Sequence, residues 1–208
     1  MKLINKGNYL KAENYKIIDY SDDYYTHLTD KYETDKQKEM NNTINKVRTR
    51  LINDYCGMES VLDYGCGTGN FIKYHALNGY CYMYGYEIIP KTVKWLKDNK
   101  MYVDPYKAIP DYIKSITMWD VFEHLPDHKP LLDNIKPGTI LFISIPIFED
   151  LGRVKESKHF LPNQHLWYYT HEGFIEYMES YNFKFLEYND LENEAGREDI
   201  ETFVFIKK

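Results

Sequence analysis

A glycine-rich turn between an apolar strand and a helix constrains the fold of this chain more than any other feature. The turn lies within Val61–Asn70, which reads VLDYGCGTGN. Apolar residues before the glycines predict a short buried strand over 60–63, and the residues after them predict a helix over 70–78. Glycines let the chain turn tightly and let a ligand approach the backbone N–H groups where the helix begins. The segment therefore predicts a ligand-binding unit of strand, turn and helix.

An alternation of strand and helix surrounds this turn. Apolar and β-branched runs predict strands over 80–87, 101–103, 115–120 and 139–145. Helical spacing predicts helices over 35–55 and 130–135, and Pro90 is expected to open another in its first turn. Strands separated by helices imply parallel pairing with right-handed crossovers.

The last part of the chain departs from this alternation. A helix over 170–181 is followed by strands over 183–188 and 202–206 around a polar loop, which predicts an antiparallel pair. We therefore expect an α/β fold. Its Rossmann-like, doubly wound sheet is mostly parallel and seven-stranded, with an antiparallel C-terminal edge strand.

The length of 208 residues fits one domain, which we place at 35–208. A Tyr-rich extension over 1–34 precedes it, and Ser21-Asp22-Asp23 is expected to cap a short helix there. Nothing in the extension decides whether it closes over a site.

Composition limits the partners of the protein. A net charge of −6 argues against a broad phosphate-binding surface, so duplex nucleic acid is not an expected partner. Cys56, Cys66 and Cys81 are odd in number and match no zinc-binding pattern. No stretch resembles a signal peptide or a membrane span. We expect a cytoplasmic protein with free thiols and no membrane partner.

Acidic residues on both sides of the turn narrow the ligand to an adenosine cofactor. Glu87 ends the second strand, about 20 residues after the turn, where a carboxylate can accept hydrogen bonds from ribose hydroxyls. The third glycine, Gly69, comes one residue earlier than in the dinucleotide pattern, and Asp63 precedes the turn. A carboxylate suits the α-amino group of S-adenosylmethionine (SAM) and would repel a pyrophosphate. SAM is therefore favoured over NAD.

Four segments in register resemble class I SAM-dependent methyltransferases. Val61–Asn70 resembles the first motif of that family, and Glu87 matches its ribose-binding acid. Met118–Asp127 resembles the fourth-strand segment, and Ile135–Thr139 resembles the turn before strand five. The segment 104–114 departs from the family pattern, and Asp104 is a weak candidate for the adenine edge.

This resemblance implies a cofactor site for SAM. It places the methionine part by the turn, the ribose at Glu87, the adenine against Ile88 and the sulfonium near Asp120. The residues it implies are Asp63, Gly65, Cys66, Gly67, Gly69, Asn70, Glu87, Ile88, Asp120 and Val121.

Two histidines are candidates for a general base. His124 and His165 carry imidazoles, which titrate near pH ~6.5 when unperturbed, and a hydroxyl acceptor needs a base to receive its proton. Asp120, Glu123 and His124 also form D-x-x-E-H, which resembles the ubiquinone-pathway O-methyltransferases and, with the later His165, the small-RNA 3′-end methyltransferases. In such enzymes these residues hold a divalent cation. We assign no metal at this stage and keep local hydrogen bonding as the alternative.

Methyl transfer from SAM to a small molecule, at oxygen, is the expected function. An RNA 3′-terminal 2′-O-methyltransferase and a non-catalytic SAM-binding regulatory subunit remain alternatives. The loop over 149–170 is expected either to line the acceptor pocket or to anchor the last helix through its aromatic residues. Arg197 is expected to make a structural ion pair or to clamp an acidic substrate.

Overall fold

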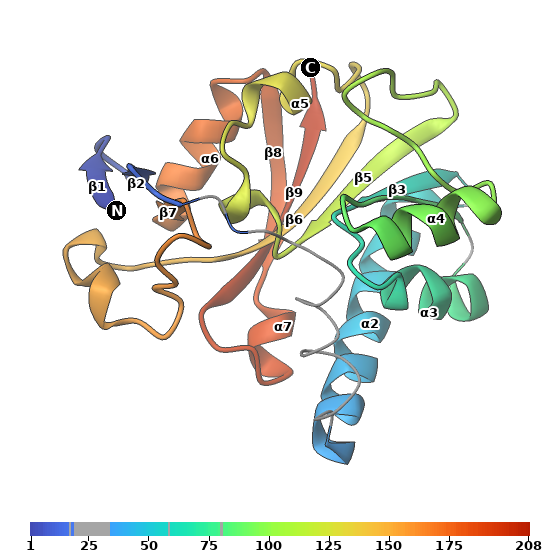
Figure 1. Cartoon of the computed structure of the whole chain (residues 1–208), viewed down its shortest axis with the longest axis horizontal. Helices are drawn as coiled ribbons and strands as arrows, with labels where there is room; N and C mark the ends of the chain where they lie inside the picture. Colours follow the sequence, from blue (N-terminus) through green and yellow to red (C-terminus); the bar gives the residue numbers. More distant parts are fainter. Residues whose placement is uncertain (17, 19–33, 58, 80) are drawn as a thin grey trace.

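A computed structural model describes residues 1–16, 18, 34–57, 59–79 and 81–208 (Figure 1). Its strands are β1 (Lys2–Asn5), β2 (Tyr9–Glu13), β3 (Ser60–Tyr64), β4 (Tyr82–Tyr86), β5 (Ile113–Trp119), β6 (Ile140–Pro146), β7 (Trp167–Tyr169), β8 (Phe183–Asn189) and β9 (Ile200–Lys207). Its helices are α2 (Asp35–Cys56), α3 (Asn70–Asn78), α4 (Pro90–Asp98), α5 (Lys129–Leu132), α6 (His171–Glu179) and α7 (Leu191–Glu194). Two 3-10 helices are η1 (Phe122–His124) and η2 (Leu151–Glu156).

The main sheet confirms the expected fold class. Its six strands lie in the order β4-β3-β5-β6-β9-β8. The four strands from β4 to β6 are parallel, whereas β9 is antiparallel to both β6 and β8. The chain order reverses between β3 and β5, which is where ligands bind in doubly wound sheets.

The sheet has six strands and not the expected seven. The segment 101–103 makes one parallel bridge, in which Gly85 donates to the Met101 carbonyl and accepts from the Val103 amide. Pairing stops there because Pro105 has no N–H to donate, and the Tyr106 amide turns back to the Asp104 carboxylate. No helix follows in the described chain before β5.

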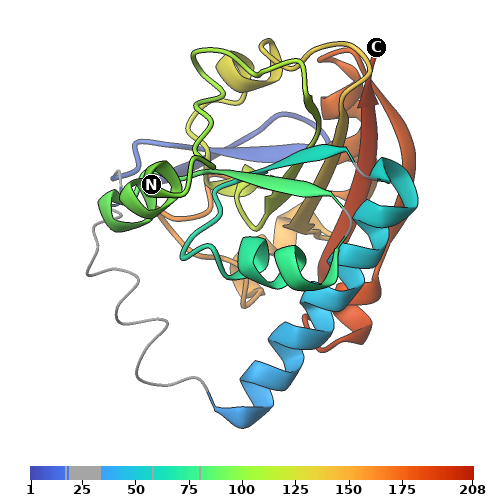
Figure 2. The same cartoon turned by 90° about the vertical axis from the view of Figure 1, so that its right-hand side faces the viewer.

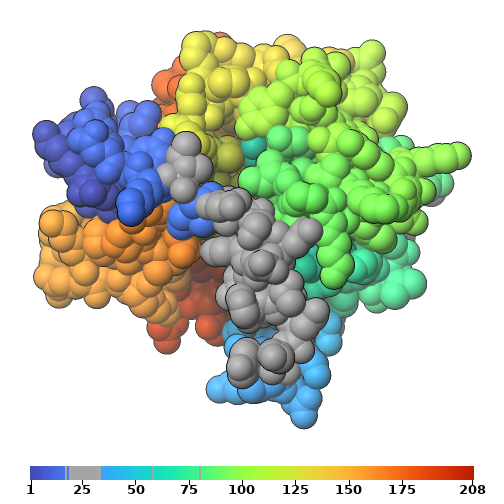
Figure 3. Space-filling view, in the orientation of Figure 1, coloured from blue at the N-terminus to red at the C-terminus, as the bar shows by residue number. Residues whose placement is uncertain are grey.

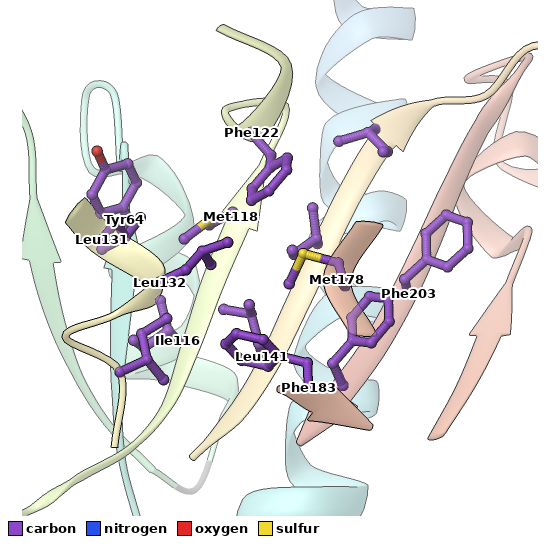
Figure 4. Packing of buried hydrophobic residues seen from close by; sticks show 14 of the residues in the cluster. Tyr64, Ile116, Met118, Phe122, Leu131, Leu132, Leu141, Met178, Phe183 and Phe203 are labelled. Carbon is purple, nitrogen blue, oxygen red and sulfur yellow. The ribbon is translucent and has the colours of Figure 1, made fainter. Parts of the chain in front are cut away.

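Alternating side chains of the strands build two apolar layers. On one face α2, α3 and α4 cover residues such as Val61, Phe142 and Val204. On the other face α5 and α6 cover a larger cluster (Figures 2 and 4). Leu141 and Phe203 point into that cluster although they neighbour Phe142 and Val204, as the two-residue period of a strand requires.

Helix ends follow local chemistry. Thr34 and Gln37 form a capping box at the start of α2, and Gly57, with a φ of 55°, stops the helix. The helix expected after Ser21-Asp22-Asp23 lies outside the described residues. The three cysteines are buried and free. None of the described helices is long and apolar enough to cross a membrane.

Residues 1–13 form a second, smaller sheet with a segment far along the chain. β1 pairs with β2, and β2 pairs antiparallel with β7, in the order β1-β2-β7. Figure 1 shows this sheet beside the start of α6. The N-terminal hairpin therefore packs on the segment that follows β6, although more than 150 residues separate β2 from β7.

Candidate functional site

The glycine-rich turn lies where the chain leaves β3 and enters α3. Gly65, Gly67 and Gly69 have φ values of 74°, 56° and 75°, a region that strongly favours glycine. A Cβ at Gly65 would lie 2.5 Å from a Val121 methyl, and one at Gly69 would lie 2.7 Å from the Trp95 ring. Both conformation and close packing therefore require glycine at Gly65 and Gly69.

Glu87 lies just beyond β4, next to this turn. Its Oε2 accepts from the Gly67 amide and its Oε1 accepts from the Ile88 amide, both at 2.7 Å. Burial raises the pKa of Glu87, and these amide donors act in the opposite direction. The carboxylate is thus held in one orientation at the carboxyl edge of the sheet.

A cavity of about 310 Å³ begins at this edge. Six of the predicted site residues line it: Gly65, Glu87, Ile88, Asp120, Val121 and His124. The other lining residues were not predicted as site residues: Tyr15, Ile18, Tyr64, Tyr86, Leu125, Pro126, Asn163, Gln164 and Leu166. Three of these, Asn163, Gln164 and Leu166, come from the loop over 149–170, whereas its aromatic residues Trp167, Tyr168 and Tyr169 are buried in β7. The loop therefore both lines the cavity and anchors the structure before α6.

The other predicted site residues do not line this cavity. Asp63 is buried in β3, where its carboxylate accepts from the Thr117 hydroxyl at 2.8 Å. Burial raises the pKa of Asp63 to about 7, opposed by Thr117 and Arg48. Cys66 packs into the core, and Asn70 lines a second cavity. Gly67, Gly69 and His165 line neither cavity.

Asp120 separates the two cavities and lines both. It follows β5 with a φ of 59°, a left-handed conformation that is uncommon outside glycine. Arg197 donates to its carboxylate at 2.6 Å, and Arg48 lies 3.5 Å from the other oxygen. Burial would raise the pKa of Asp120, but the two guanidinium groups hold it below its usual value.

Both arginines also bind Glu192, a buried residue of α7. Arg48 donates twice to its carboxylate and Arg197 donates once, while the Ser144 hydroxyl donates to the same group. Arg197 therefore makes the structural ion pair expected of it, but with Glu192 and Asp120 and not with its sequence neighbours. Sequence reasoning missed Arg48 and Glu192, because Arg48 lies 72 residues from Asp120 and 144 residues from Glu192 in the chain.

The second cavity, about 650 Å³ in volume, is polar. Arg48, Arg197, Asn70 and Asp120 lie on its wall, together with side chains of α2 that include Lys38 and three asparagines.

Glu123, His124 and His165 lie close together in the structure. One Glu123 oxygen lies 3.9 Å from His124 Nε2 and 4.0 Å from His165 Nε2, and the two rings meet edge-on. Glu123 is buried, and neither of its oxygens hydrogen-bonds another of the described residues. Burial, with Asp120 nearby, raises the pKa of Glu123, while burial lowers the pKa of His165 to about 3.

These three side chains fit a cation better than the full D-x-x-E-H set does. Their ligand atoms lie within 4.8 Å of one another, and a buried carboxylate without a partner is a group that a cation would satisfy. Asp120 does not fit, because Arg197 and Arg48 engage its oxygens. The structure thus supports three of the four ligands that the resemblance implies.

Comparison with known proteins agrees with this geometry. A family model described as a methyltransferase domain matches residues 22–188. No curated protein matches the chain. Similar solved structures include magnesium protoporphyrin IX methyltransferase from Synechocystis PCC 6803 with bound SAH, at 15% identity and a TM-score of 0.59 over 90% of this chain and 94% of that chain.

Two further structures share the fold. The mitomycin 7-O-methyltransferase MmcR has 11% identity and a TM-score of 0.61, covering 83% of this chain and 55% of that one. The glycopeptide N-methyltransferase MtfA with sinefungin has 11% identity and a TM-score of 0.55, covering 86% of this chain and 100% of that one. The family match spans most of the sequence, and its motifs form the turn, the acidic strand end and the cavity described above. The chain accordingly belongs to the methyltransferase-domain family and is a SAM-dependent methyltransferase with a class I, Rossmann-like fold.

Proposed function

We propose that this enzyme transfers the methyl group of SAM to an oxygen atom of a small molecule. The observation that carries the proposal is the buried cluster of Glu123 and two imidazoles, one of which, His124, lines the same cavity as Glu87. The structural neighbours include both an O- and an N-methyltransferase, so the fold does not fix the acceptor atom. The choice of oxygen depends on the cluster.

SAM would lie along the cavity from Glu87 to Asp120. The Glu87 carboxylate is oriented by two amides and keeps lone pairs for ribose hydroxyls. Gly65 and Val121 pack closely on the wall between these two acids, because a side chain at Gly65 would strike Val121. In this arrangement the sulfonium end would face Asp120 and the acceptor would face His124.

His124 is the better placed of the two candidate bases because it lines the cavity. Its Nδ1 lies 3.0 Å from the Gln164 carbonyl, which can only accept, so the ring proton is on Nδ1 and Nε2 is the nitrogen that would receive the acceptor's proton. Burial lowers the pKa of His124, whereas Asp120 and the Gln164 carbonyl act to raise it. The net lowering of the pKa keeps the ring neutral at pH 7. In the transfer, the acceptor oxygen forms a bond to the methyl carbon as the carbon–sulfur bond breaks, and the hydroxyl proton passes to the base.

The same cluster could act through a divalent cation. Glu123, His124 and His165 would hold the ion, which would supply a Lewis acid that lowers the pKa of an acceptor hydroxyl. Burial without a hydrogen-bond partner makes Glu123 the main anionic ligand of such a site.

An RNA acceptor is less consistent with the cavity. Phosphate recognition needs Lys or Arg, and none of the described residues that line this cavity is either. A non-catalytic regulatory subunit would have no use for two imidazoles beside the cofactor site.

Methyl-labelled SAM and a mixed set of phenols, alcohols and amines test this proposal. We expect label on hydroxyl compounds, and His124→Ala should lower kcat about 100-fold while the SAM dissociation constant stays within about threefold. His159→Ala is the matched control, because its imidazole contacts the Glu198 carbonyl and does not line the cavity. Exclusive labelling of amines would overturn the choice of oxygen, and full activity of His124→Ala in the presence of a chelator would remove both roles of the cluster.

A further inference from the structure

The N-terminal hairpin is anchored next to the part of the cavity lined by His124, Gln164 and Leu166, which is called the acceptor end below. Tyr9 packs against the rings of Trp167, Tyr169 and Tyr177 at centroid distances of 5.3 to 5.8 Å. The Asn8 carbonyl accepts from the Thr170 hydroxyl. A Cβ at the facing Gly173 would lie 1.9 Å from the Asn8 carbonyl oxygen, so the hairpin and α6 are in direct backbone contact.

Leu166 connects this hairpin to the Glu123 cluster through the backbone. Its carbonyl accepts from the Ala12 amide, and its own amide donates to the Glu123 carbonyl, both at 2.7 Å. Leu166 also lines the cavity. The strand β2 and the turn that carries Glu123 therefore share one hydrogen-bonded residue.

Beyond β2 the chain bends toward the cavity. Asn14 adopts a left-handed φ of 54°, and the following Tyr15 lines the cavity. The Lys16 amide donates to the Asn163 side chain at 3.2 Å, which ties this segment to another lining residue. Figure 3 shows the N-terminal residues in blue against the orange segment that precedes β7 and the yellow segment near residue 130.

The chemistry of the described cavity wall is unfavourable to anionic acceptors. Apart from Glu87, Asp120 and His124, the described lining residues are apolar or uncharged, and they include Tyr15, Ile18, Leu125, Pro126, Asn163, Gln164 and Leu166. The charged residues on the cavity wall are the carboxylates of Glu87 and Asp120, and the described lining residues include no Lys or Arg. A carboxylate or phosphate would lose its hydration here without gaining a partner.

We infer that Tyr15, held in place by the N-terminal hairpin, is a specificity-determining residue that contacts the methyl acceptor, and that the acceptor is an uncharged, largely apolar compound with a hydroxyl group. This inference rests on the proposed function and adds the substrate class.

Binding to the complex of the protein with S-adenosylhomocysteine tests it without requiring turnover. The probes are naphthalene-2,3-diol and the same ring with a 6-sulfonate, titrated by calorimetry. We expect the diol to bind at least about tenfold more tightly than the sulfonate, because the cavity offers the sulfonate no cation. Tyr15→Ala should weaken diol binding about tenfold or more, whereas Tyr15→Phe, the matched control, should stay within about twofold. Neither change should alter the affinity for S-adenosylhomocysteine by more than about twofold.

A second variant keeps the test valid if Tyr15→Ala does not fold. Asn163→Gly preserves the left-handed backbone at that position but removes the acceptor for the Lys16 amide, and it should weaken diol binding by a smaller factor. Equal binding of the sulfonate, no binding of the diol, or unchanged affinity in both variants would overturn the inference. Failure of the wild-type protein to bind SAM or S-adenosylhomocysteine would instead overturn the proposed function.

Discussion

The two ends of the cavity differ in how their polar groups are satisfied. At the Glu87 end, both carboxylate oxygens accept backbone hydrogen bonds from residues of the turn and the strand end. At the His124 end, both oxygens of the buried Glu123 lack such bonds to other described residues. A buried polar group without a partner costs stability, so its retention points to a ligand that satisfies it. The protein itself thus satisfies the Glu87 carboxylate at the cofactor end, whereas the Glu123 carboxylate at the acceptor end has no hydrogen-bond partner among the described residues.

The two ends also differ in where their residues come from. Gly65 and Glu87 lie 22 residues apart, each directly after one strand of the parallel pair β3 and β4. The acceptor end combines β2, the turn after β5 and the segment before β7, which meet through Leu166. Local sequence therefore specifies the first end, and long-range packing specifies the second.

The largest effect should follow from breaking the cofactor end at Gly65. Gly65→Ala adds a methyl group that would overlap Val121 in a left-handed backbone. Together these effects cost about 2 kcal/mol or more. We expect SAM affinity, measured by calorimetry, to fall at least about 30-fold.

Gly138→Ala is the matched control for this change. Gly138 has a similar φ of 84°, but nothing lies within 4 Å of the added Cβ. The control should lose stability without losing SAM affinity. Equal affinity of the two variants would mean that the close approach of Gly65 and Val121 does not shape the cofactor site.

A smaller effect is expected from Glu87→Gln. A carboxylate can accept from the Gly67 and Ile88 amides at once, whereas an amide side chain would turn its NH₂ group toward one of them. Loss of one charge-assisted bond costs about 1.5–3 kcal/mol, so SAM affinity should fall about tenfold or more. Glu198→Gln, which changes an exposed ion pair with Lys158, should bind SAM normally. The control ligand is an adenosine analogue without ribose hydroxyls. If Glu87→Gln weakens the binding of this analogue as much as it weakens the binding of SAM, Glu87 does not bind the ribose hydroxyls.

The smallest effect concerns the pH dependence of stability at Asp63. Burial raises the pKa of Asp63 to about 7, from an ordinary value near 3.8, so the folded state holds a proton that the unfolded state releases in this interval. This contribution to wild-type stability is therefore present below pH ~4 and is lost as the pH rises toward 7.

Asp63→Asn removes that titration while keeping an oxygen for the Thr117 hydroxyl. The variant should gain stability relative to wild type between pH 4 and 8, seen as a rise of several degrees in relative Tm. A relative Tm that does not change with pH would show that Asp63 stays ionised in the folded protein.

Much of the fold was predictable because its signals are local. The helix over 70–78 and the antiparallel pair at the end of the chain were found where expected. Glycines that end a helix and alternating apolar residues that form a strand can both be recognised within a few consecutive residues. The prediction of a seventh strand was wrong because the apolar run 101–103 is followed by Pro105 and a turn, which limit its pairing to one bridge. The hairpin of β1 and β2 was missed because β2 pairs with the distant strand β7. The sequence of a short strand does not indicate which other strand it will pair with.

By itself, the sequence determined the cofactor end of this protein: the turn at Gly65, the acid at Glu87 and the parallel sheet that brings them together. Only the tertiary structure decided that Arg48 and Arg197 form ion pairs with Asp120 and that Glu123 is buried beside two imidazoles. It also decided that Tyr15 lines the cavity that Gly65 and Glu87 line. The physical reason is the range of the interactions. Turn geometry and the pairing of neighbouring strands depend on residues close together in the sequence. Buried charges and cavity walls depend on which distant segments pack together.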